Sequence, residues 1–108
     1  MSAQVTFEAR QAPADSAYPR CSSVKGRVLA ALLRGESITH LDCWRRFSSS
    51  RLSHHIYMLR AVGWPIDCTE EPVPTSDGRT AIIGRYSLPQ SAIGEAGEGG
   101  QRYAGLLL

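Results

Sequence analysis

The stretch from Thr39 to Gly63, THLDCWRRFSSSRLSHHIYMLRAVG, limits the possible folds of this chain more than any other. Thr39 is a favourable N-cap residue, and Asp42 three residues later completes a pattern close to a capping box, so we expect a helix to begin here. Leu41 and Trp44 share one face of that helix. We therefore expect this face, and Trp44 in particular, to belong to the core.

A serine-rich turn separates that helix from a second one. The hydroxyls of Ser48, Ser49 and Ser50 compete for backbone groups and favour a turn over a continuing helix. The second helix is expected at about residues 49–62, because an apolar stripe at helical spacing is followed there by a glycine stop, namely Leu52, Ile56, Leu59 and Gly63. Two helices joined by so short a turn are typical of a helix-turn-helix motif.

The segments on either side complete a small α+β unit. Residues Val24 to Arg34 follow a serine cap and repeat apolar residues at helical spacing, which predicts a first helix. After Gly63 the period changes to two, in residues 64–69 and again in 81–88. The loop between these runs, residues 71–80, contains the turn signal Asp77-Gly78. The sequence thus predicts three helices followed by a two-stranded β-hairpin.

The two ends of the chain are expected to lie outside this unit. Residues 1–21 mix alanine, proline, serine and charged residues, which favours a flexible N-terminal arm. Residues 90–108 are rich in glycine, alanine and glutamate, which favours a flexible tail. The folded domain is therefore expected over residues 22–89.

In this order of elements the chain resembles a winged helix-turn-helix domain, in which a hairpin, the wing, follows the second helix of the motif. The resemblance covers about Val24 to Leu88, in the segments VLAALLRGESITHLDCWRRF, RLSHHIYMLRAVGWPI and RYSL. More narrowly, the chain is similar to the small helix-turn-helix proteins that phages and bacterial prophages encode. The resemblance implies binding to double-stranded DNA and regulation of phage or host genes.

If the second helix of the motif enters a major groove, its outward side chains would contact the DNA. In this geometry the N-terminal residues reach the base edges, so Arg51 could bind guanine through two hydrogen bonds. Its polar neighbours could contact bases or phosphates. The candidate residues on this helix are Ser49, Ser50, Arg51, Ser53, His54 and Tyr57, with His55 and Met58 beside them. An ordinary solvated polar face is the alternative interpretation.

Three arginines outside this helix are candidates for phosphate contacts. Arg45 and Arg46 end the first helix of the motif, although attraction to a helix C-terminus explains them equally well. Arg79 lies beside the predicted hairpin turn and could enter a minor groove, although a hairpin tip also needs polar residues for solubility. The formal net charge is only +2, but seven basic and two acidic residues lie between Val24 and Val62. A local basic face matters more for DNA binding than the total charge does.

Other residue patterns argue against a metalloprotein, an enzyme or a membrane protein. The cysteines Cys21, Cys43 and Cys68 are odd in number and widely spaced, which disfavours a disulfide framework, and the last two are expected to be buried. The chain has no CxxC or HxxxH pair for zinc, and no P-loop or Gly-x-Ser-x-Gly motif. It also has no long apolar run and no signal-peptide pattern. We expect a cytoplasmic, non-enzymatic protein without a cofactor.

Two kinds of macromolecular partner remain open. Because one domain of this size reads few base pairs, a homodimer is expected on DNA, through the N-terminal arm, the first helix or the apolar segment Tyr103–Leu108. The alternative is a protein-interaction module that binds a host or phage protein without reading DNA. Glu70 and Glu71 favour this alternative, since they would repel DNA if they faced the groove.

Overall fold

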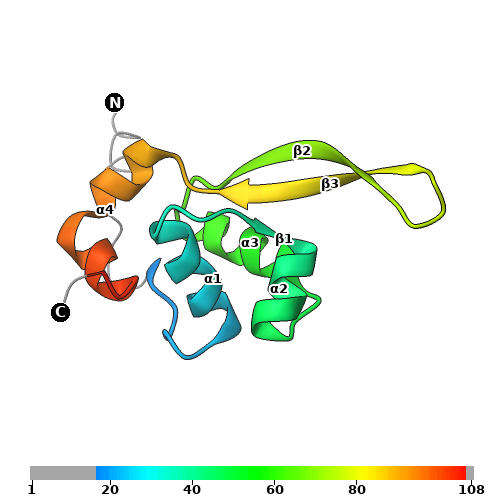
Figure 1. The fold of residues 1–108 in the computed structure, drawn as a ribbon. Helices are drawn as coiled ribbons and strands as arrows, with labels where there is room; N and C mark the ends of the chain where they lie inside the picture. Colours follow the sequence, from blue (N-terminus) through cyan, green and yellow to red (C-terminus); the bar gives the residue numbers. More distant parts are fainter. Residues whose placement is uncertain (1–16, 107–108) are drawn as a thin grey trace.

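The computed structural model describes residues 17–106, and in this part of the chain helices and strands form one α+β unit (Figure 1). The elements follow the order α1 (Val24–Leu33), β1 (Ile38–Thr39), α2 (His40–Phe47), α3 (Leu52–Ala61), β2 (Asp67–Pro74), β3 (Thr80–Ser87) and α4 (Gln90–Tyr103). The three strands form an antiparallel sheet in the order β1-β3-β2. The α+β class is as predicted, whereas β1 and α4 were not predicted.

Helix α1 provides one wall of the core. The Ser23 side chain accepts a hydrogen bond from the backbone N–H of Gly26, which caps the first turn. Three apolar side chains on the inner face are fully buried: Val28, Leu29 and Leu32. The chain leaves the helix through Gly35, whose φ of 88° lies in the left-handed region that glycine adopts without strain. The predicted first helix is therefore confirmed.

Helices α2 and α3 form the predicted helix-turn-helix. The Thr39 side chain accepts from the Asp42 N–H, and the Asp42 carboxylate accepts from the Thr39 N–H, so the predicted capping box is present. Ser48 then adopts a left-handed conformation and ends α2. The expected start of the second helix near residue 49 is wrong, since α3 begins at Leu52. The predicted inward stripe is confirmed, because Leu52, Ile56 and Leu59 are all buried.

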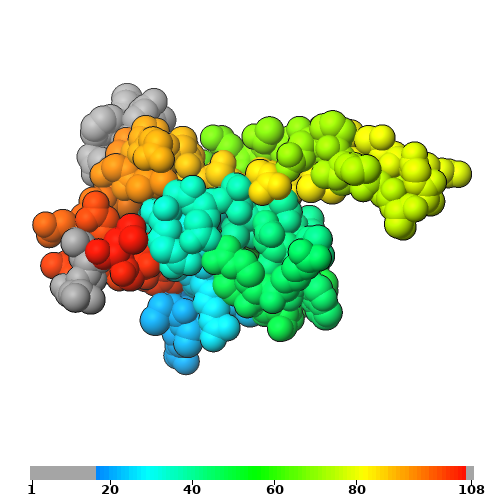
Figure 2. Space-filling view, viewed as in Figure 1, coloured from blue at the N-terminus to red at the C-terminus, as the bar shows by residue number. Residues whose placement is uncertain are grey.

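Strands β2 and β3 form a hairpin that projects past the helices (Figures 1 and 2). The pairing runs without interruption from Asp67↔Ser87 to Pro74↔Thr80. Half of the segment predicted as a loop, residues 71–80, is therefore strand, namely residues 71–74 and residue 80. The turn itself lies at the predicted position, with Gly78 at a φ of 85°. Pro72 and Pro74 disfavour a position in the middle of a sheet, but β2 is an edge strand, where proline is tolerated.

A short third strand connects the motif to the hairpin. Ile38 and Thr39 pair with Tyr86 and Arg85 of β3 before the chain enters α2. Ile38 is fully buried. Two residues carry too little period-two pattern to predict a strand, so only the packing of β3 beside them defines it.

The expected flexible tail over residues 90–108 requires a correction, because residues 90–103 form α4. Helix α4 contacts α1 and buries Ala92, Ala96 and Gly100, while Ala104 directly after it is buried as well. A kink at Gly97, with a φ of 60°, divides it into two parts. The glycine-rich composition suggested a linker, but here the small residues allow α4 to pack closely on the domain.

The domain also extends further towards the N-terminus than predicted. The first sixteen residues of the expected arm, 1–21, lie outside the described part of the chain. Ala17, by contrast, is buried, and its carbonyl oxygen accepts a hydrogen bond of 2.9 Å from the Trp64 indole N–H. The ring of Tyr18 packs against the rings of Trp64 and Tyr103. Residues 17 and 18 therefore belong to the folded unit. Within residues 17–106, no helix has the length and apolarity to cross a membrane.

Candidate nucleic-acid interface

The outer face of α3 presents polar and aromatic side chains to solvent. Ser53, His54 and Tyr57 are exposed, with Tyr57 at 69%, while the opposite side of the same helix is buried in the core. Positions 53, 54 and 57 follow helical spacing, so they form one stripe along α3. Three of the predicted site residues are thus brought together on a single surface.

Arg51 and Ser50 lie at the exposed N-terminal end of this stripe. Arg51 occupies the N-cap position of α3, and its side chain makes no capping hydrogen bond. Its guanidinium has no ion-pair partner among the described residues. Arg51 therefore keeps all its donors for an external acceptor.

Ser49 has structural partners in the turn. Its hydroxyl lies 3.3 Å from the Nε2 of His55 and accepts a hydrogen bond from the Arg51 backbone N–H. It also forms a hydrogen bond with the thiol of Cys43. Burial raises the pKa of this thiol. Burial lowers the pKa of His55, and the charges of His54, Arg51 and Lys25 lower it further. The position of Ser49 fixes the turn and aims its side chain towards the protein.

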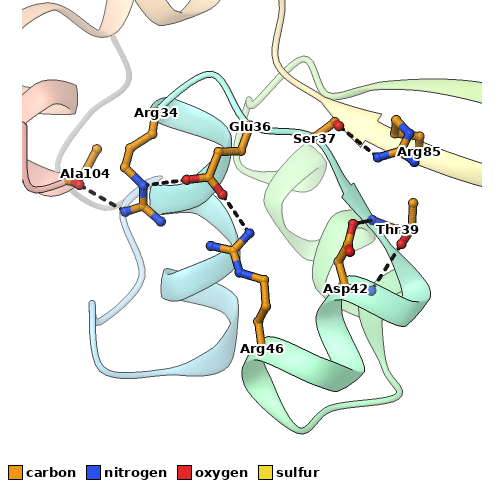
Figure 3. A network of polar contacts seen from close by, with 8 residues as sticks. All are labelled: Arg34, Glu36, Ser37, Thr39, Asp42, Arg46, Arg85 and Ala104. Carbon is orange, nitrogen blue, oxygen red and sulfur yellow. Dashed lines mark hydrogen bonds and ion pairs between the residues drawn. The ribbon is translucent and has the colours of Figure 1, made fainter.

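The two adjacent arginines of α2 differ in their contacts. Arg45 is exposed and makes no ion pair within the described residues, whereas Arg46 binds Glu36 at 2.6 Å (Figure 3). Arg34 binds the second oxygen of the same carboxylate at 2.9 Å and also donates to the carbonyl of Ala104. Hydrogen bonds from Arg34 and Arg46 hold the Glu36 pKa below its ordinary range. Arg45 is therefore the better candidate for phosphate contact.

Arg60 is a further basic residue with a structural role. Its guanidinium donates two hydrogen bonds, of 3.1 and 2.7 Å, to the carbonyl of Ile66 and lies over the ring of Tyr86. It thereby ties the end of α3 to the start of the sheet. Three of the seven basic residues counted between Val24 and Val62 thus bond within the protein: Arg34, Arg46 and Arg60.

The wing tip carries Arg79 with 85% of its side chain exposed. The carboxylate of the neighbouring Asp77 lies 3.7 Å from its guanidinium. Hydrogen bonds from the Thr75 hydroxyl and the Arg79 backbone N–H hold the Asp77 pKa below its ordinary range. Arg79 lies in the turn between β2 and β3, and this hairpin projects beyond the helices (Figure 1). It could reach DNA only at a separate place.

Two residues near α3 were not identified as site candidates from the sequence. His40, at the start of α2, has its Nε2 3.2 Å from the hydroxyl of Ser53 and so links α2 to the exposed stripe. Trp44 was predicted to be core but is 58% exposed, and Leu41 is exposed as well. Cys43, which is buried, and Phe47, which is partly buried, stand at i and i+4 and were the available signal for the inward side of α2.

The acidic residues beside the hairpin are partly neutralised. Glu71 binds Arg85 at 2.6 Å across the sheet, while Glu70 is exposed.

The expected burial of Cys68 is wrong, because its strand, β2, lies at the sheet edge and the residue is exposed. Among residues 17–106, no three His, Cys, Asp or Glu side chains lie together as a metal site would require.

Comparison with known families agrees with this architecture. A family model described as a winged helix-turn-helix domain matches residues 23–91, which is more than half of the chain. No curated protein and no solved structure shows a significant match. A winged helix-turn-helix domain indicates DNA binding in general.

Proposed function

The chain belongs to the winged helix-turn-helix family, and we propose that it is a sequence-specific DNA-binding protein that regulates phage or prophage genes. In this proposal α3 enters the major groove of double-stranded DNA. The resemblance of its three quoted segments to small phage and prophage proteins supports the biological setting. The protein acts in the cytoplasm, without a cofactor or metal and without enzymatic activity.

The exposed stripe on α3 is the observation that carries this proposal. It places hydroxyl, imidazole and phenol groups on one side of a helix whose other side is anchored in the core. A rigid support of this kind holds side chains in register with base edges. Ser50 and Arg51 extend the stripe at the end of the helix that enters the groove first. We assign base contacts to Arg51, Ser53 and His54.

Phosphate contacts come from residues outside this stripe in the proposed complex. Arg45 at the end of α2 and Arg79 at the wing tip are exposed cations outside the stripe. Arg46 joins them only by leaving Glu36, which costs one ion pair. Tyr57 supplies a hydroxyl further along α3. Because a single domain reads few base pairs, the proposed species on DNA is a homodimer.

A protein-interaction role is the second candidate, and one observation favours it. Leu41 and Trp44 are both exposed on the outer side of α2. Exposed apolar side chains that lie together are typical of protein contact sites. In this alternative, α2 would bind a host or phage protein and α3 would not read DNA.

Selection of bound sequences from random duplex DNA at two salt concentrations tests the proposal. We expect an enriched motif and an affinity that falls steeply with salt, because each neutralised phosphate releases counterions. A palindromic motif would support the homodimer. Absence of retention at low salt would contradict DNA binding and favour the protein-interaction alternative.

A further inference from the structure

One half of the inner strand β3 has an open edge. β1 stands opposite β3 only at Tyr86 and Arg85, and the chain then turns away into α2. Within residues 17–106, Thr80–Gly84 therefore pair on one side only, with β2. Ile82 lies at the middle of this segment and is 62% exposed. An exposed apolar side chain on an unpaired strand indicates an edge that another strand can cover.

The backbone groups of the open segment point outward at alternate residues. In an antiparallel pair, opposite residues alternate between those that exchange both hydrogen bonds and those whose N–H and C=O point away. Pro72 stands opposite Ile82, and Pro74 stands opposite Thr80. Because proline has no N–H, these two pairs belong to the second kind. Thr80, Ile82 and, by alternation, Gly84 therefore present N–H and C=O groups to the open edge.

The two edges of the hairpin differ in how they are protected. The outer strand β2 carries two prolines and three carboxylates, which discourage strand addition: Pro72, Pro74, Asp67, Glu70 and Glu71. The open segment of β3 has the sequence TAIIG, with no proline and no charge. Natural sheets seldom leave such an edge uncovered. A covering strand is therefore expected at β3 and not at β2.

The open segment is complementary to a second copy of itself. Antiparallel pairing about a two-fold axis at Ile82 places Thr80 of one copy opposite Gly84 of the other. All the outward backbone groups are then used, because each outward residue meets another and exchanges two hydrogen bonds with it. Ile82 meets Ile82 on the axis, which covers the exposed apolar side chain. No like charges face each other across this edge.

The surroundings of the edge leave room for this partner. The hairpin projects past the helices, so a second hairpin can approach along it (Figures 1 and 2). A groove of about 420 Å³ lies between the start of α2 and the hairpin, lined by Leu41, Val73 and Ile83 among others. In the pairing described, Ala81 of the second copy stands opposite Ile83. A small side chain thus lies beside the groove wall.

The charges at the ends of this pairing are opposite. Since Thr80 faces Gly84, the hairpin tip of each copy lies beside the start of α2 of the other copy. The tip carries the exposed Arg79, and Asp42 lines the groove at the start of α2. The attraction between these charges favours a second copy as the occupant, because one hairpin supplies both the neutral edge and the positive tip.

We propose that this chain forms a homodimer in which the open edges of β3 pair antiparallel about a two-fold axis at Ile82. The two hairpins then form one sheet in the order β2-β3-β3-β2. This interface belongs to the homodimer of the proposed function and rests on that part of it, but it does not depend on DNA reading. It differs from the N-terminal arm, the first helix and the C-terminal segment considered from the sequence. Because the paired segment is short, the dimer should be weak, with a Kd on the order of micromolar.

Cysteine cross-linking of the full chain without DNA tests the pairing. The exposed Cys21 and Cys68 are first replaced by serine, which leaves the buried Cys43. Ile82→Cys places two thiols across the axis, where the Cα atoms of a hydrogen-bonded pair lie about 5.5 Å apart, a distance that a disulfide spans. The matched control Glu70→Cys places an exposed thiol on the other edge of the same hairpin. Under mild oxidation at micromolar concentration, the disulfide dimer should form at least about tenfold faster with Ile82→Cys, because a preformed pair raises the effective thiol concentration.

Sedimentation equilibrium gives a second measurement on the chain with its own cysteines. Ile82→Lys places two positive charges opposite each other on the axis and removes the apolar contact, so the Kd should rise at least about tenfold. Glu70→Lys adds positive charge to the other edge and should dimerise as the wild type does. Both substituted positions are exposed, so the variants should fold.

Three outcomes overturn this interface. They are equal cross-linking at the two cysteine positions, a dimer that survives Ile82→Lys, and a wild type that stays monomeric at all concentrations. The proposed function fails by a different result, namely the absence of DNA retention at low salt. A palindromic DNA motif together with a dimer that survives Ile82→Lys would keep the proposed homodimer and assign it to another surface.

Discussion

At the level of single residues, the arginines of this chain differ by what they contact. Arg60 and Arg34 donate to backbone carbonyls and Arg46 binds Glu36, whereas Arg45 and Arg51 keep their donors for an external partner. A count of basic residues along the sequence cannot make this distinction. The contacts therefore reduce the candidate site to fewer, better defined cations.

The first prediction concerns Arg51, at the N-terminus of α3. The variant Arg51→Ala should weaken binding to the selected DNA sequence by about 1–3 kcal/mol, because a bidentate base contact is lost. Arg102→Ala is the matched control. It removes the same charge from α4, where Arg102 lies 4.0 Å from Glu98, and it should leave affinity nearly unchanged. Fluorescence anisotropy measures both, and equal affinities for the two variants would remove Arg51 from the site.

A second prediction concerns the partly buried imidazole of His55. Burial lowers its pKa below the ordinary value of 6.5, so the folded protein favours the neutral ring. The corresponding stability is fully present above pH 6.5 and is lost as the pH falls through the lowered pKa. Urea unfolding should show that the free energy of unfolding falls between pH 7.5 and 5, and that this fall is smaller in His55→Gln than in the wild type. The control variant His54→Gln changes the exposed neighbour and should show most of the fall seen in the wild type. An identical fall in His55→Gln and the wild type would contradict this assignment.

At the level of elements, helix α1 contains a glycine at a close contact. A Cβ at Gly26 would lie 2.7 Å from the Tyr103 hydroxyl oxygen and would overlap the Arg20 carbonyl. Glycine therefore allows the chain before α1 and the end of α4 to approach the helix. The same residue type at Gly94 in α4 has open space around it.

These two glycines give opposite predictions for the same substitution. Gly26→Ala should destabilise the protein by about 1–3 kcal/mol through overpacking, in spite of the better helix propensity of alanine. Gly94→Ala should stabilise it by up to about 1 kcal/mol, because nothing opposes the propensity gain. Urea denaturation measures both changes. Stabilisation by Gly26→Ala would show that the chain around Arg20 does not pack on α1.

At the level of the whole molecule, residues near the two ends of the described chain bond to each other and to α1, and so close the domain. The Tyr103 hydroxyl donates a 2.6 Å hydrogen bond to the Pro19 carbonyl, and burial raises the pKa of Tyr103 to about 12. Arg34 in turn donates to the Ala104 carbonyl. Helix α4 thus connects the N-terminal residues to α1, on the side of the domain away from the wing (Figure 1).

Truncation after Pro89 tests this closure. It removes α4 with the buried Ala92 and Ala96. It also removes two hydrogen bonds, from the Tyr103 hydroxyl to Pro19 and from Arg34 to Ala104. We expect the free energy of unfolding to fall by at least about 2 kcal/mol, since each hydrogen bond contributes about 1 kcal/mol and apolar burial adds to them. Tyr103→Phe, which loses one hydroxyl, should cost less than the truncation. An unchanged denaturation midpoint after truncation would show that α4 does not stabilise the domain.

The sequence by itself determined the features that depend on near neighbours in the chain. The capping box of Thr39 and Asp42, the inward stripe of α3 and the turn at Gly78 each involve residues a few positions apart. Their hydrogen bonds and helical spacing are local, so they can be predicted from composition and order. The exposed candidates on α3 follow from the same spacing, because fixing the buried side of a helix also fixes its outer side.

Only the tertiary structure decided the features that join distant parts of the chain. Helix α4 is glycine-rich and is stabilised by packing on α1, which no local pattern reveals. The exposure of Trp44 depends on which face of α2 meets the core, and the ion pair of Arg46 depends on Glu36 ten residues away. The open edge of β3 exists because β1 ends where α2 begins. In each case the free energy comes from contacts that form only when the whole domain has folded.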